Sequence, residues 1–390
     1  MSKQFQKKRI LLLSIAHFFH DVYPAFFAPI LPLLMTKLSL SLTAASLLDV
    51  ARRIPSLLTL FIGLLADKKP LKYFIILTPA ITGISMSFIG IVSDFYSIFT
   101  LLFIAGLSSI CFHIPAPVLV KNFSGKTLKK GMSYFMSAGA IAGTVGTFGI
   151  TLTITYLGLN YTYILMYFGI GMSIVLYFKL KDISSVHISK KKQDEIIRFS
   201  ESRKAFIPFF IFLGLFMLFC AGMKLSLTLY LPVYMTTNGA SVFFSGISLS
   251  ALHFAGAIGM IVIGKYSDKF STKKMIFYLV ILSVILMHGM IFFQNNSIIM
   301  LIFVIALGFV LFAMAPMILA LVQYHNSSRP AFVNSIYFTI GFIINTTIVL
   351  LLGYCGDKLG LENTFKICAY LPLFSLPFLY FISENLNKSK

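Results

Sequence analysis

The sequence of 390 residues has no tryptophan and only 12 acidic residues, against 32 lysines and arginines. Charged residues make up 11% of the chain, compared with roughly a quarter in soluble domains, and hydrophobic residues make up 58%. So little charge cannot keep this much apolar surface in solution, which excludes a soluble globular protein. The mean hydropathy of +0.91 indicates an integral membrane protein instead.

Cysteine is also scarce, and its placement excludes two kinds of cross-link. The four cysteines fall within or at the end of apolar segments, and no two have C-x-x-C spacing. A disulfide framework and a structural zinc site are therefore not indicated. The nucleotide-binding pattern G-x-x-x-x-G-K-[ST] is missing as well, so we expect no cofactor and an ion gradient as the energy source.

Long apolar runs are what the sequence has in abundance. A window of about 20 residues, the length that crosses a bilayer as a helix, picks out twelve candidates. They span residues 10–35, 44–66, 72–92, 96–120, 132–157, 161–178, 206–235, 242–264, 275–293, 297–322, 331–353 and 364–383. His17, His20 and Asp21 interrupt the first run, so we interpret it as a retained helix and not as a signal peptide.

The basic residues fall mainly on one side of these segments. Successive connections between the segments lie on alternate sides of the membrane. Of the 32 basic residues, 26 lie at the two termini, in the central loop or in the connections on the same side as these. Cytoplasmic loops carry such an excess. The pattern predicts a multi-pass protein of the cell (inner or plasma) membrane with both termini cytoplasmic. Because orientation accounts for most of the basic excess, no nucleic-acid partner is expected.

The chain contains an internal repeat. Adding 201 to the residue numbers takes Pro115 to Pro316, and it takes four residues of one short loop to identical residues of another. These are Gly63, Asp67, Lys68 and Lys72, which become Gly264, Asp268, Lys269 and Lys273. We predict a six-helix bundle over 1–178, a cytoplasmic linker over 179–205 and a second bundle over 206–390. Because six is even, the halves run parallel, related by a pseudo-twofold axis along the membrane normal.

The loop that starts at Gly63 reads G-L-L-A-D-K-K-P-L-K and resembles the signature G-x-x-x-D-[RK]-x-G-[RK]-[RK] of the major facilitator superfamily. The resemblance covers essentially the whole chain and implies that superfamily's all-α membrane fold of twelve transmembrane helices. It also implies a cytoplasmic gate that holds the outward-facing state. The gate residues would be Gly63, Asp67, Lys68 and Lys72 with Gly264, Asp268 and Lys269. Both copies depart from the signature at its eighth and ninth positions.

Two further segments resemble the fosmidomycin-resistance type of exporter within that superfamily. They are His17-Phe-Phe-His20-Asp21 and Ser108-Ser-Ile-Cys-Phe-His113. This resemblance implies export. Antiport is favoured because the fifth segment carries Gly139, Gly143, Gly146 and Gly149, similar to the glycine-rich antiporter signature, although Thr147 stands where that signature has proline. The chain departs from that branch after His113, where Ile-Pro-Ala-Pro stands in place of Pro-Glu and supplies no carboxylate.

A charge inside the membrane is costly unless it is paired or faces water, so each such residue is a candidate for function. In the first helix, His17, His20 and Asp21 share one face at spacings of three and four residues. A desolvated carboxylate beside imidazoles suits proton coupling or substrate contact. The alternative is a static His–Asp hydrogen bond that joins the helix to a neighbour.

The second helix carries Asp49 three and four residues before Arg52 and Arg53. Asp49 can neutralise one arginine and leave the other for Asp21 or for an anionic substrate, because the guanidinium fork suits carboxylate or phosphonate. The alternative places Asp49 near the outer interface, where charge is solvated.

Further candidates lie in the second half and in the fourth helix. Lys224 is two positions from the counterpart of Asp21, and His253 is the counterpart of Arg52. A cavity between the first and seventh helices, with Asp21 and Lys224 on its walls, would suit an anionic or zwitterionic solute. Snorkelling of Lys224 to an interface is the alternative. His113 is either a packing residue or a ligand.

Together these features predict a secondary active transporter, not an enzyme, that exports a small anionic or zwitterionic compound against protons and acts as a monomer in the lipid bilayer. Import of a small solute stays an alternative. So does transport of a transition metal or metal chelate, in which His113 or His253 would complete the ligands of the first helix. A membrane-embedded transferase is an alternative of another class, but an acyltransferase H-x-x-x-x-D pattern fails because His17 and Asp21 are one residue too close.

Overall fold

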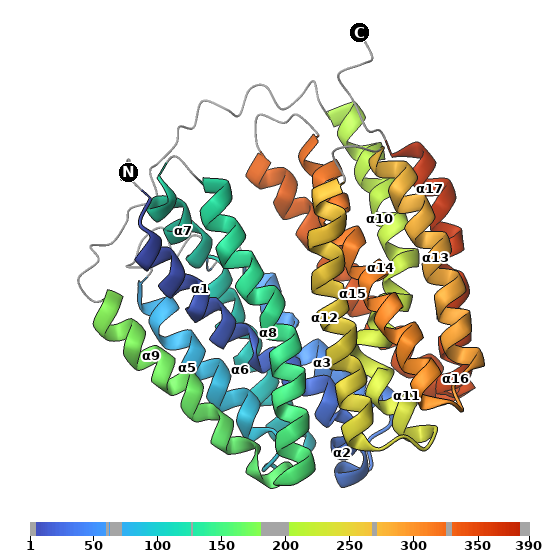
Figure 1. Cartoon of the computed structure of the whole chain (residues 1–390), viewed down its shortest axis with the longest axis horizontal. Helices are drawn as coiled ribbons and strands as arrows, with labels where there is room; N and C mark the ends of the chain where they lie inside the picture. Colours follow the sequence, from blue (N-terminus) through green and yellow to red (C-terminus); the bar gives the residue numbers. More distant parts are fainter. Residues whose placement is uncertain are drawn as a thin grey trace. The chain divides into compact units, whose positions relative to one another are not determined.

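The computed structural model is helical, with no strand among the residues it describes, which are 5–59, 62, 72–125, 128–180, 203–266, 271–324 and 330–382 (Figure 1). Ten helical spans in this part of the chain are long and apolar enough to cross a membrane, and Lys72–Phe88 is a shorter apolar helix. These eleven coincide with eleven of the twelve predicted segments, and the remaining one, 44–66, is described only in part. The predicted all-α membrane architecture is confirmed.

The chain divides into two compact units, each described here by itself. Unit 1 comprises Met1–Ser189 and Ser241–Ser250, and unit 2 comprises Lys190–Ala240 and Ala251–Lys390. The predicted linker over 179–205 falls largely outside the described residues.

Unit 1 contains the helices of the first half. Their bounds are α1 (Lys7–Asp21), η1 (Tyr23–Phe26), α2 (Phe27–Leu38), α3 (Leu42–Ala51), η2 (Ile54–Leu58), α5 (Lys72–Phe88), α6 (Phe95–His113), α7 (Ala116–Ser124), α8 (Leu128–Tyr156), η3 (Leu159–Leu165) and α9 (Met166–Leu180). Buried side chains of α1, α5, α6, α7, α8 and α9 form one hydrophobic core, so α1 lies among its neighbours.

Unit 2 contains the helices of the second half. Their bounds are α10 (Arg203–Leu225), η6 (Ser226–Tyr230), α11 (Leu231–Thr237), α12 (Val242–Tyr266), α13 (Thr272–Phe292), α14 (Ser297–Tyr324), α15 (Pro330–Leu359), α16 (Leu361–Tyr370), η8 (Leu371–Ser375) and α17 (Leu376–Phe381). The first turns of α12, through Ser250, belong to unit 1.

The first long helix of each half is interrupted at a matching place. α1 ends at Asp21, and in the following 3-10 turn Pro24 has no N–H to offer the carbonyl of His20. α10 ends at Leu225 and continues as the π-helical turn η6, with Pro232 in the first turn of α11. Adding 201 to Asp21 gives position 222, three residues before the end of α10. The interruption places His20 and Asp21 at the C-terminal end of α1.

Close helix crossings also recur in the two halves. A Cβ added to Gly106 of α6 would overlap the main-chain carbonyl of Arg52, and one added to Gly308 of α14 would overlap that of Leu252. Adding 201 to Arg52 gives 253, so the two crossings involve equivalent parts of the repeat. Small residues let membrane helices approach this closely. The crossing in unit 1 holds the end of α3, and with it Arg52, against α6.

Candidate functional site

Asp21 contacts two histidines, one on its own helix and one on α6. Its Oδ2 lies 3.0 Å from Nε2 of His17, one turn earlier on α1, and its Oδ1 lies 3.1 Å from Nε2 of His113, the last residue of α6. His17 is buried, whereas the side chains of Asp21 and His113 are 24% and 41% exposed. We call these three residues the histidine–aspartate cluster. It is closed on the side of His17 and open on the side of His113.

The hydrogen-bond partners of His17 define which ring atom carries a hydrogen. Nδ1 lies 2.8 Å from the main-chain oxygen of Phe135 in α8, and a carbonyl only accepts, so Nδ1 carries a hydrogen. Nε2 of a neutral His17 would then turn its lone pair toward an ionised Asp21, 3.0 Å away. Two acceptors at that distance repel each other. The contact therefore holds one further proton, carried by the imidazole or by the carboxyl group.

Aromatic rings hold the histidines in place. The His17 ring is stacked on Phe135 at 4.0 Å between centroids and on Phe112 at 5.7 Å. The His20 ring is stacked on Phe112 at 4.5 Å. His113 meets the His17 ring edge-on at 5.2 Å. Because both neighbours of the His17 ring are themselves buried, Nε2 of His17 stays directed at Asp21.

His20 lies beside the cluster at the end of a hydrogen-bond chain. Ser108 donates to the carbonyl of Thr78 at 3.1 Å, and Thr82 donates to Ser108 at 2.8 Å. Because the hydroxyl hydrogen of Thr82 is used, its oxygen accepts from Nδ1 of His20 at 3.3 Å. Nε2 of this fully buried ring has no hydrogen-bond partner in the described part of the chain. The chain of bonds ties α1 to α5 and α6 and gives His20 a structural place.

Helix α8 presents glycines to the cluster. A Cβ on Gly139 would lie 2.5 Å from Cε1 of His17, 2.8 Å from its Nε2 and 3.1 Å from Oδ2 of Asp21. A Cβ on Gly146 would overlap the main chain just beyond the end of α1, whereas one on Gly149 would meet nothing within 4 Å. Gly139 therefore leaves the space in which the His17–Asp21 contact forms.

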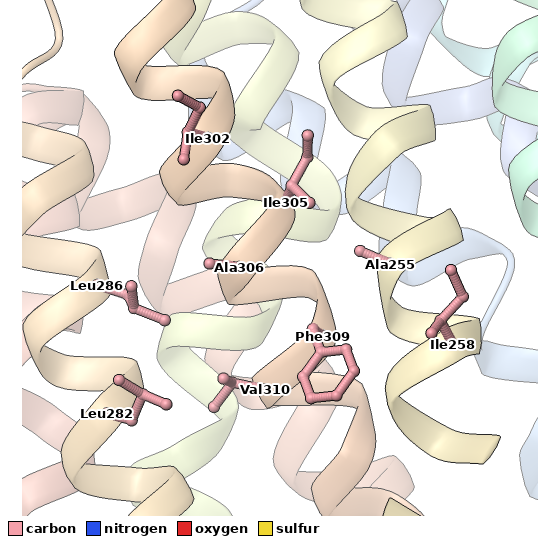
Figure 2. A pocket seen from close by; sticks show the side chains of 9 residues that line it. All are labelled: Ala255, Ile258, Leu282, Leu286, Ile302, Ile305, Ala306, Phe309 and Val310. Carbon is pink, nitrogen blue, oxygen red and sulfur yellow. The ribbon is translucent and has the colours of Figure 1, made fainter. Parts of the chain in front are cut away.

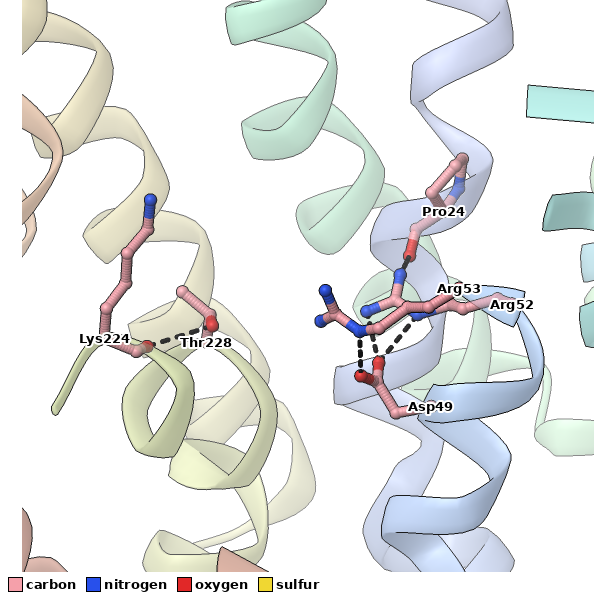
Figure 3. Close-up of polar contacts among 6 residues, drawn as sticks. All are labelled: Pro24, Asp49, Arg52, Arg53, Lys224 and Thr228. Atoms are coloured by element: carbon pink, nitrogen blue, oxygen red, sulfur yellow. Dashed lines mark hydrogen bonds and ion pairs between the residues drawn. The ribbon is translucent and has the colours of Figure 1, made fainter. Parts of the chain in front are cut away.

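A second group of charges, the arginine cluster, consists of Asp49, Arg52 and Arg53 (Figure 3). Asp49 accepts from Nε of Arg52 at 2.7 Å and from Nε of Arg53 at 2.6 Å, and Nη2 of Arg52 also contacts it. Nη1 of Arg52 donates to the carbonyl of Pro24 at 3.3 Å. Asp49 is fully buried, which disagrees with the alternative of a solvated position for it, while the arginine side chains are 26% and 22% exposed. Two guanidinium groups against one carboxylate leave a net charge of about +1.

In unit 2, Lys224 and His253 meet at one aromatic ring. Nζ of Lys224 lies 4.8 Å from the centroid of Phe312, and the His253 ring meets Phe312 edge-on at 5.4 Å. The main-chain oxygen of Lys224, at the end of α10, accepts from the hydroxyl of Thr228 at 3.0 Å (Figure 3). Phe312 therefore orients the two basic side chains that the sequence predicts for the second half.

Unit 2 also has an apolar pocket of about 580 Å³ between α12, α13 and α14 (Figure 2). It is lined by Ala255, Ile258, Leu282, Leu286, Ile302, Ile305, Ala306, Phe309 and Val310. Several of these side chains are exposed, Ile302 to 61%, as expected of residues that meet lipid. None of the lining side chains can orient a polar solute by hydrogen bonds.

The structure groups most of the predicted site residues but not in every predicted combination. The contact of His113 with Asp21 brings the fourth helix to the first, as the ligand alternative for His113 requires. The ion pairs described for Asp21 are with histidines, and Arg52 and Arg53 both pair with Asp49, so the alternative of an arginine paired with Asp21 is not what forms. His253, the other residue considered as a ligand together with the first helix, belongs to unit 2, whereas Asp21 belongs to unit 1.

Several residues that support the cluster carry no signal in the sequence that would identify them. Phe135 contributes a carbonyl and a stacked ring, and it belongs to no motif that would predict these contacts. Thr82 stands out only as a hydroxyl residue within an apolar helix, and Ser108 only as the first residue of the segment that resembles the exporter. Their pairing depends on the packing of α5 against α6, which side-chain type alone does not specify.

Most of the predicted gate lies outside the described residues. This applies to Gly63, Asp67, Lys68, Asp268 and Lys269. Gly264 lies within α12, and Lys72 begins α5 with its Nζ 5.5 Å from the centroid of Tyr73. The gate stays a prediction.

A family model covers most of the chain. The model described as Major Facilitator Superfamily matches residues 13–348. The chain is similar to the fosmidomycin resistance protein of Escherichia coli (strain K12), with 21% identity over 383 residues that cover 96% of this chain and 93% of that protein.

Solved structures show the same fold at 14% identity. The chain is similar to a D-xylose-proton symporter, with a TM-score of 0.75 over 99% of this chain and 100% of the other. It is also similar to a bacterial homolog of the human lysosomal transporter Spinster, with a TM-score of 0.72, 14% identity and coverage of 98% and 95%. The nucleoside transporter NupG gives a TM-score of 0.70, 14% identity and coverage of 96% and 99%.

Proposed function

The chain belongs to the Major Facilitator Superfamily, and from that premise we propose that it exports a small anionic or zwitterionic compound in exchange for protons. Membership makes it a multi-pass membrane transporter, not an enzyme, with the lipid bilayer and a small-molecule substrate as partners. Its fold is that of the superfamily.

The observation that carries proton coupling is the 3.0 Å contact between Nε2 of His17 and Oδ2 of Asp21. Because Nδ1 of His17 is committed to a carbonyl, the contact needs one proton more than a neutral imidazole and a carboxylate supply. The partial exposure of Asp21 and His113 gives water a route to that proton. An intramembrane carboxyl group that exchanges a proton with water is what coupling to a proton gradient requires.

The arginine cluster supports the substrate class. With the carboxylate of Asp49 included, the cluster keeps a net charge of about +1. Its two guanidinium groups are also partly exposed. Charge-assisted hydrogen bonds from a guanidinium fork suit a carboxylate or phosphonate. Lys224, with His253 on Phe312, is a further candidate contact for such a group.

Export is supported by similarity to a protein whose name states resistance to fosmidomycin. The excess of basic residues on one side supports cytoplasmic termini and insertion in the cell membrane. We propose that the monomer carries out the whole transport cycle.

Reconstitution tests the proposed function. The protein is placed in liposomes that contain a pH-sensitive dye, and anionic, zwitterionic, neutral and cationic solutes are added under an imposed pH gradient. We expect an anionic or zwitterionic solute to move opposite to protons. Movement of solute and protons in the same direction would make the chain an importer, and solute transport without proton flux would refute coupling.

Arg53→Gln should raise the KM for an anionic solute by about tenfold or more, because it removes a charge-assisted hydrogen bond. Asp49 keeps Arg52 as its partner, so the fold should persist. Initial rates over a concentration series measure the change. Lys37→Gln is a control for loss of one positive charge, since Lys37 donates to main-chain carbonyls at residues 90–92. A KM shift of equal size in both variants would remove Arg53 from the binding site.

Gly139→Ala should lower proton-driven transport by about tenfold or more, because the new methyl group displaces His17 or Asp21 and small misplacements of reacting groups carry large rate penalties. Gly149→Ala is the matched control, since its Cβ meets nothing within 4 Å on the same helix. Transport rates of the two variants under the same gradient measure the difference. Equal rates would show that α8 does not constrain the cluster.

A further inference from the structure

We propose that His17, Asp21 and His113 form a binding site for a divalent transition-metal ion such as Zn²⁺, Co²⁺ or Ni²⁺. Each residue offers one ligand atom, and the three atoms lie within 4.8 Å of one another. Two imidazoles and one carboxylate suit ions of this class. Mg²⁺ and Ca²⁺ prefer oxygen ligands alone, and Cu⁺ prefers sulfur.

The spacing of the ligand atoms fits such an ion. Nitrogen and oxygen ligands about 2.0–2.1 Å from zinc in a tetrahedral site lie about 3.3–3.4 Å from each other. The observed contacts of Asp21 are 3.0 Å from Oδ2 to His17 and 3.1 Å from Oδ1 to His113. The two imidazoles therefore have to approach each other, and the carboxylate either turns to present one oxygen or binds through both. His113 can supply that approach because it is 41% exposed and ends α6.

The surroundings of His17 prepare it as a ligand. Metal-binding histidines usually donate their second ring N–H to a carbonyl or carboxylate, which fixes the tautomer and the direction of the lone pair. Nδ1 of His17 faces the carbonyl of Phe135 at 2.8 Å, and the ring is stacked on Phe135 at 4.0 Å. The lone pair of Nε2 is thereby directed at the centre of the cluster. The exposure on the side of His113 leaves room for water ligands.

Helix ends add a negative potential. Asp21 is the last residue of α1 and His113 the last of α6, and carbonyl groups at helix C-termini attract cations. Pro24 and Pro117 lie four residues after His20 and His113 and have no N–H for those carbonyls. A cation therefore meets two converging helix ends as well as the three side chains.

The metal site does not depend on the proposed function. The ion would occupy the space between His17 and Asp21 that the shared proton occupies in the transport cycle. Binding is measured on the full chain in detergent, without a gradient, and coupled transport is measured with a chelator present. Failure of either measurement leaves the other standing.

Titration of the purified, chelator-stripped chain with Zn²⁺ by calorimetry, and with Co²⁺ by visible absorption, tests the site. We expect one ion per chain and visible bands of nitrogen- and oxygen-bound Co²⁺ at low coordination number. His113→Gln and Asp21→Asn should each weaken binding by about tenfold or more. His288→Gln is the matched control and should bind as the native chain does, because His288 bonds within α13 at Val284 and packs on Tyr370. Unchanged affinity in His113→Gln, or an equal loss in His288→Gln, would overturn the proposal.

A second measurement uses the native chain and so avoids any variant that fails to fold. Diethyl pyrocarbonate modifies exposed imidazoles, and mass spectrometry locates the modified residue. Zn²⁺ should slow modification of the exposed His113 by about tenfold or more at saturation, and Mg²⁺ should not. Modification of His113 at the same rate with and without Zn²⁺ would refute the metal site.

Discussion

Asp21→Asn should abolish proton-driven transport in liposomes while leaving the protein folded. An asparagine amide has nearly the shape of the carboxylate and can donate to or accept from His17 and His113, so the contact between α1 and α6 persists. The amide does not titrate, so it cannot take up and release the coupling proton. We expect solute-dependent proton flux to fall by about 100-fold or more, the scale on which positioned proton-transfer groups act. Exchange of labelled for unlabelled solute, which needs no net proton movement, should stay within a few-fold.

Asp94→Asn is the matched control for that substitution. Asp94 caps the N-terminus of α6, where its carboxylate accepts from the main-chain N–H of Ser97 at 2.8 Å. Hydrogen bonds from Ser97 hold the pKa of Asp94 below its ordinary value. Asp94 therefore stays ionised near neutral pH. The stability that its charged carboxylate gives to the start of α6 is lost only as the pH falls and the carboxylate is protonated. Asparagine caps helices about as well, so transport should not change. Coupled flux in Asp21→Asn equal to that in Asp94→Asn would rule out Asp21 as the proton carrier.

The membrane spans could be predicted from the sequence because a bilayer sets their length locally. About 20 apolar residues are needed to cross, whatever the helix packs against. The interruptions of the first and seventh helices could not be predicted from hydropathy, because the segments 10–35 and 206–235 are each long enough to cross the membrane with Pro24 and Pro232 inside them. Those interruptions decide the site, since they end α1 at Asp21 and α10 beside Lys224.

Contacts between helices lay beyond the sequence for a different reason. The spacing of His17 and Asp21 predicts their mutual contact, because residues four apart on a helix are neighbours. The contact of Asp21 with His113 joins residues 92 positions apart. It depends on how closely α6 and α8 approach α1, which glycines permit but do not direct. Gly139 illustrates this, because nothing in the sequence identifies His17 as the side chain that it faces.

Asp49→Asn should lower the stability of unit 1 by about 3–5 kcal/mol, the usual effect of removing one partner from a buried ion pair. Asp49 is fully buried and accepts from both Arg52 and Arg53. Without that charge, the two guanidinium groups repel each other with no carboxylate between them, while the crossing of Gly106 with the main chain of Arg52 holds the end of α3 in place. The apparent melting temperature in detergent should fall by on the order of 10 °C. Glu362→Gln is the control, because its ion pair with Lys366 is about half exposed and such pairs contribute less than about 1 kcal/mol.

The double variant Asp49→Asn with Arg53→Gln separates a structural role of the arginine cluster from a role in binding. If Asp49 serves to neutralise Arg53, removing both charges leaves Arg52, which still donates to the carbonyl of Pro24. Most of the lost stability should then return, with a coupling energy of about 1–3 kcal/mol between the two substitutions. Solute affinity should stay as low as in Arg53→Gln alone, because the restored fold lacks the guanidinium group. If the double variant recovers both stability and solute affinity, the cluster only holds α3 in place. If it recovers stability but not solute affinity, the excess positive charge binds the solute.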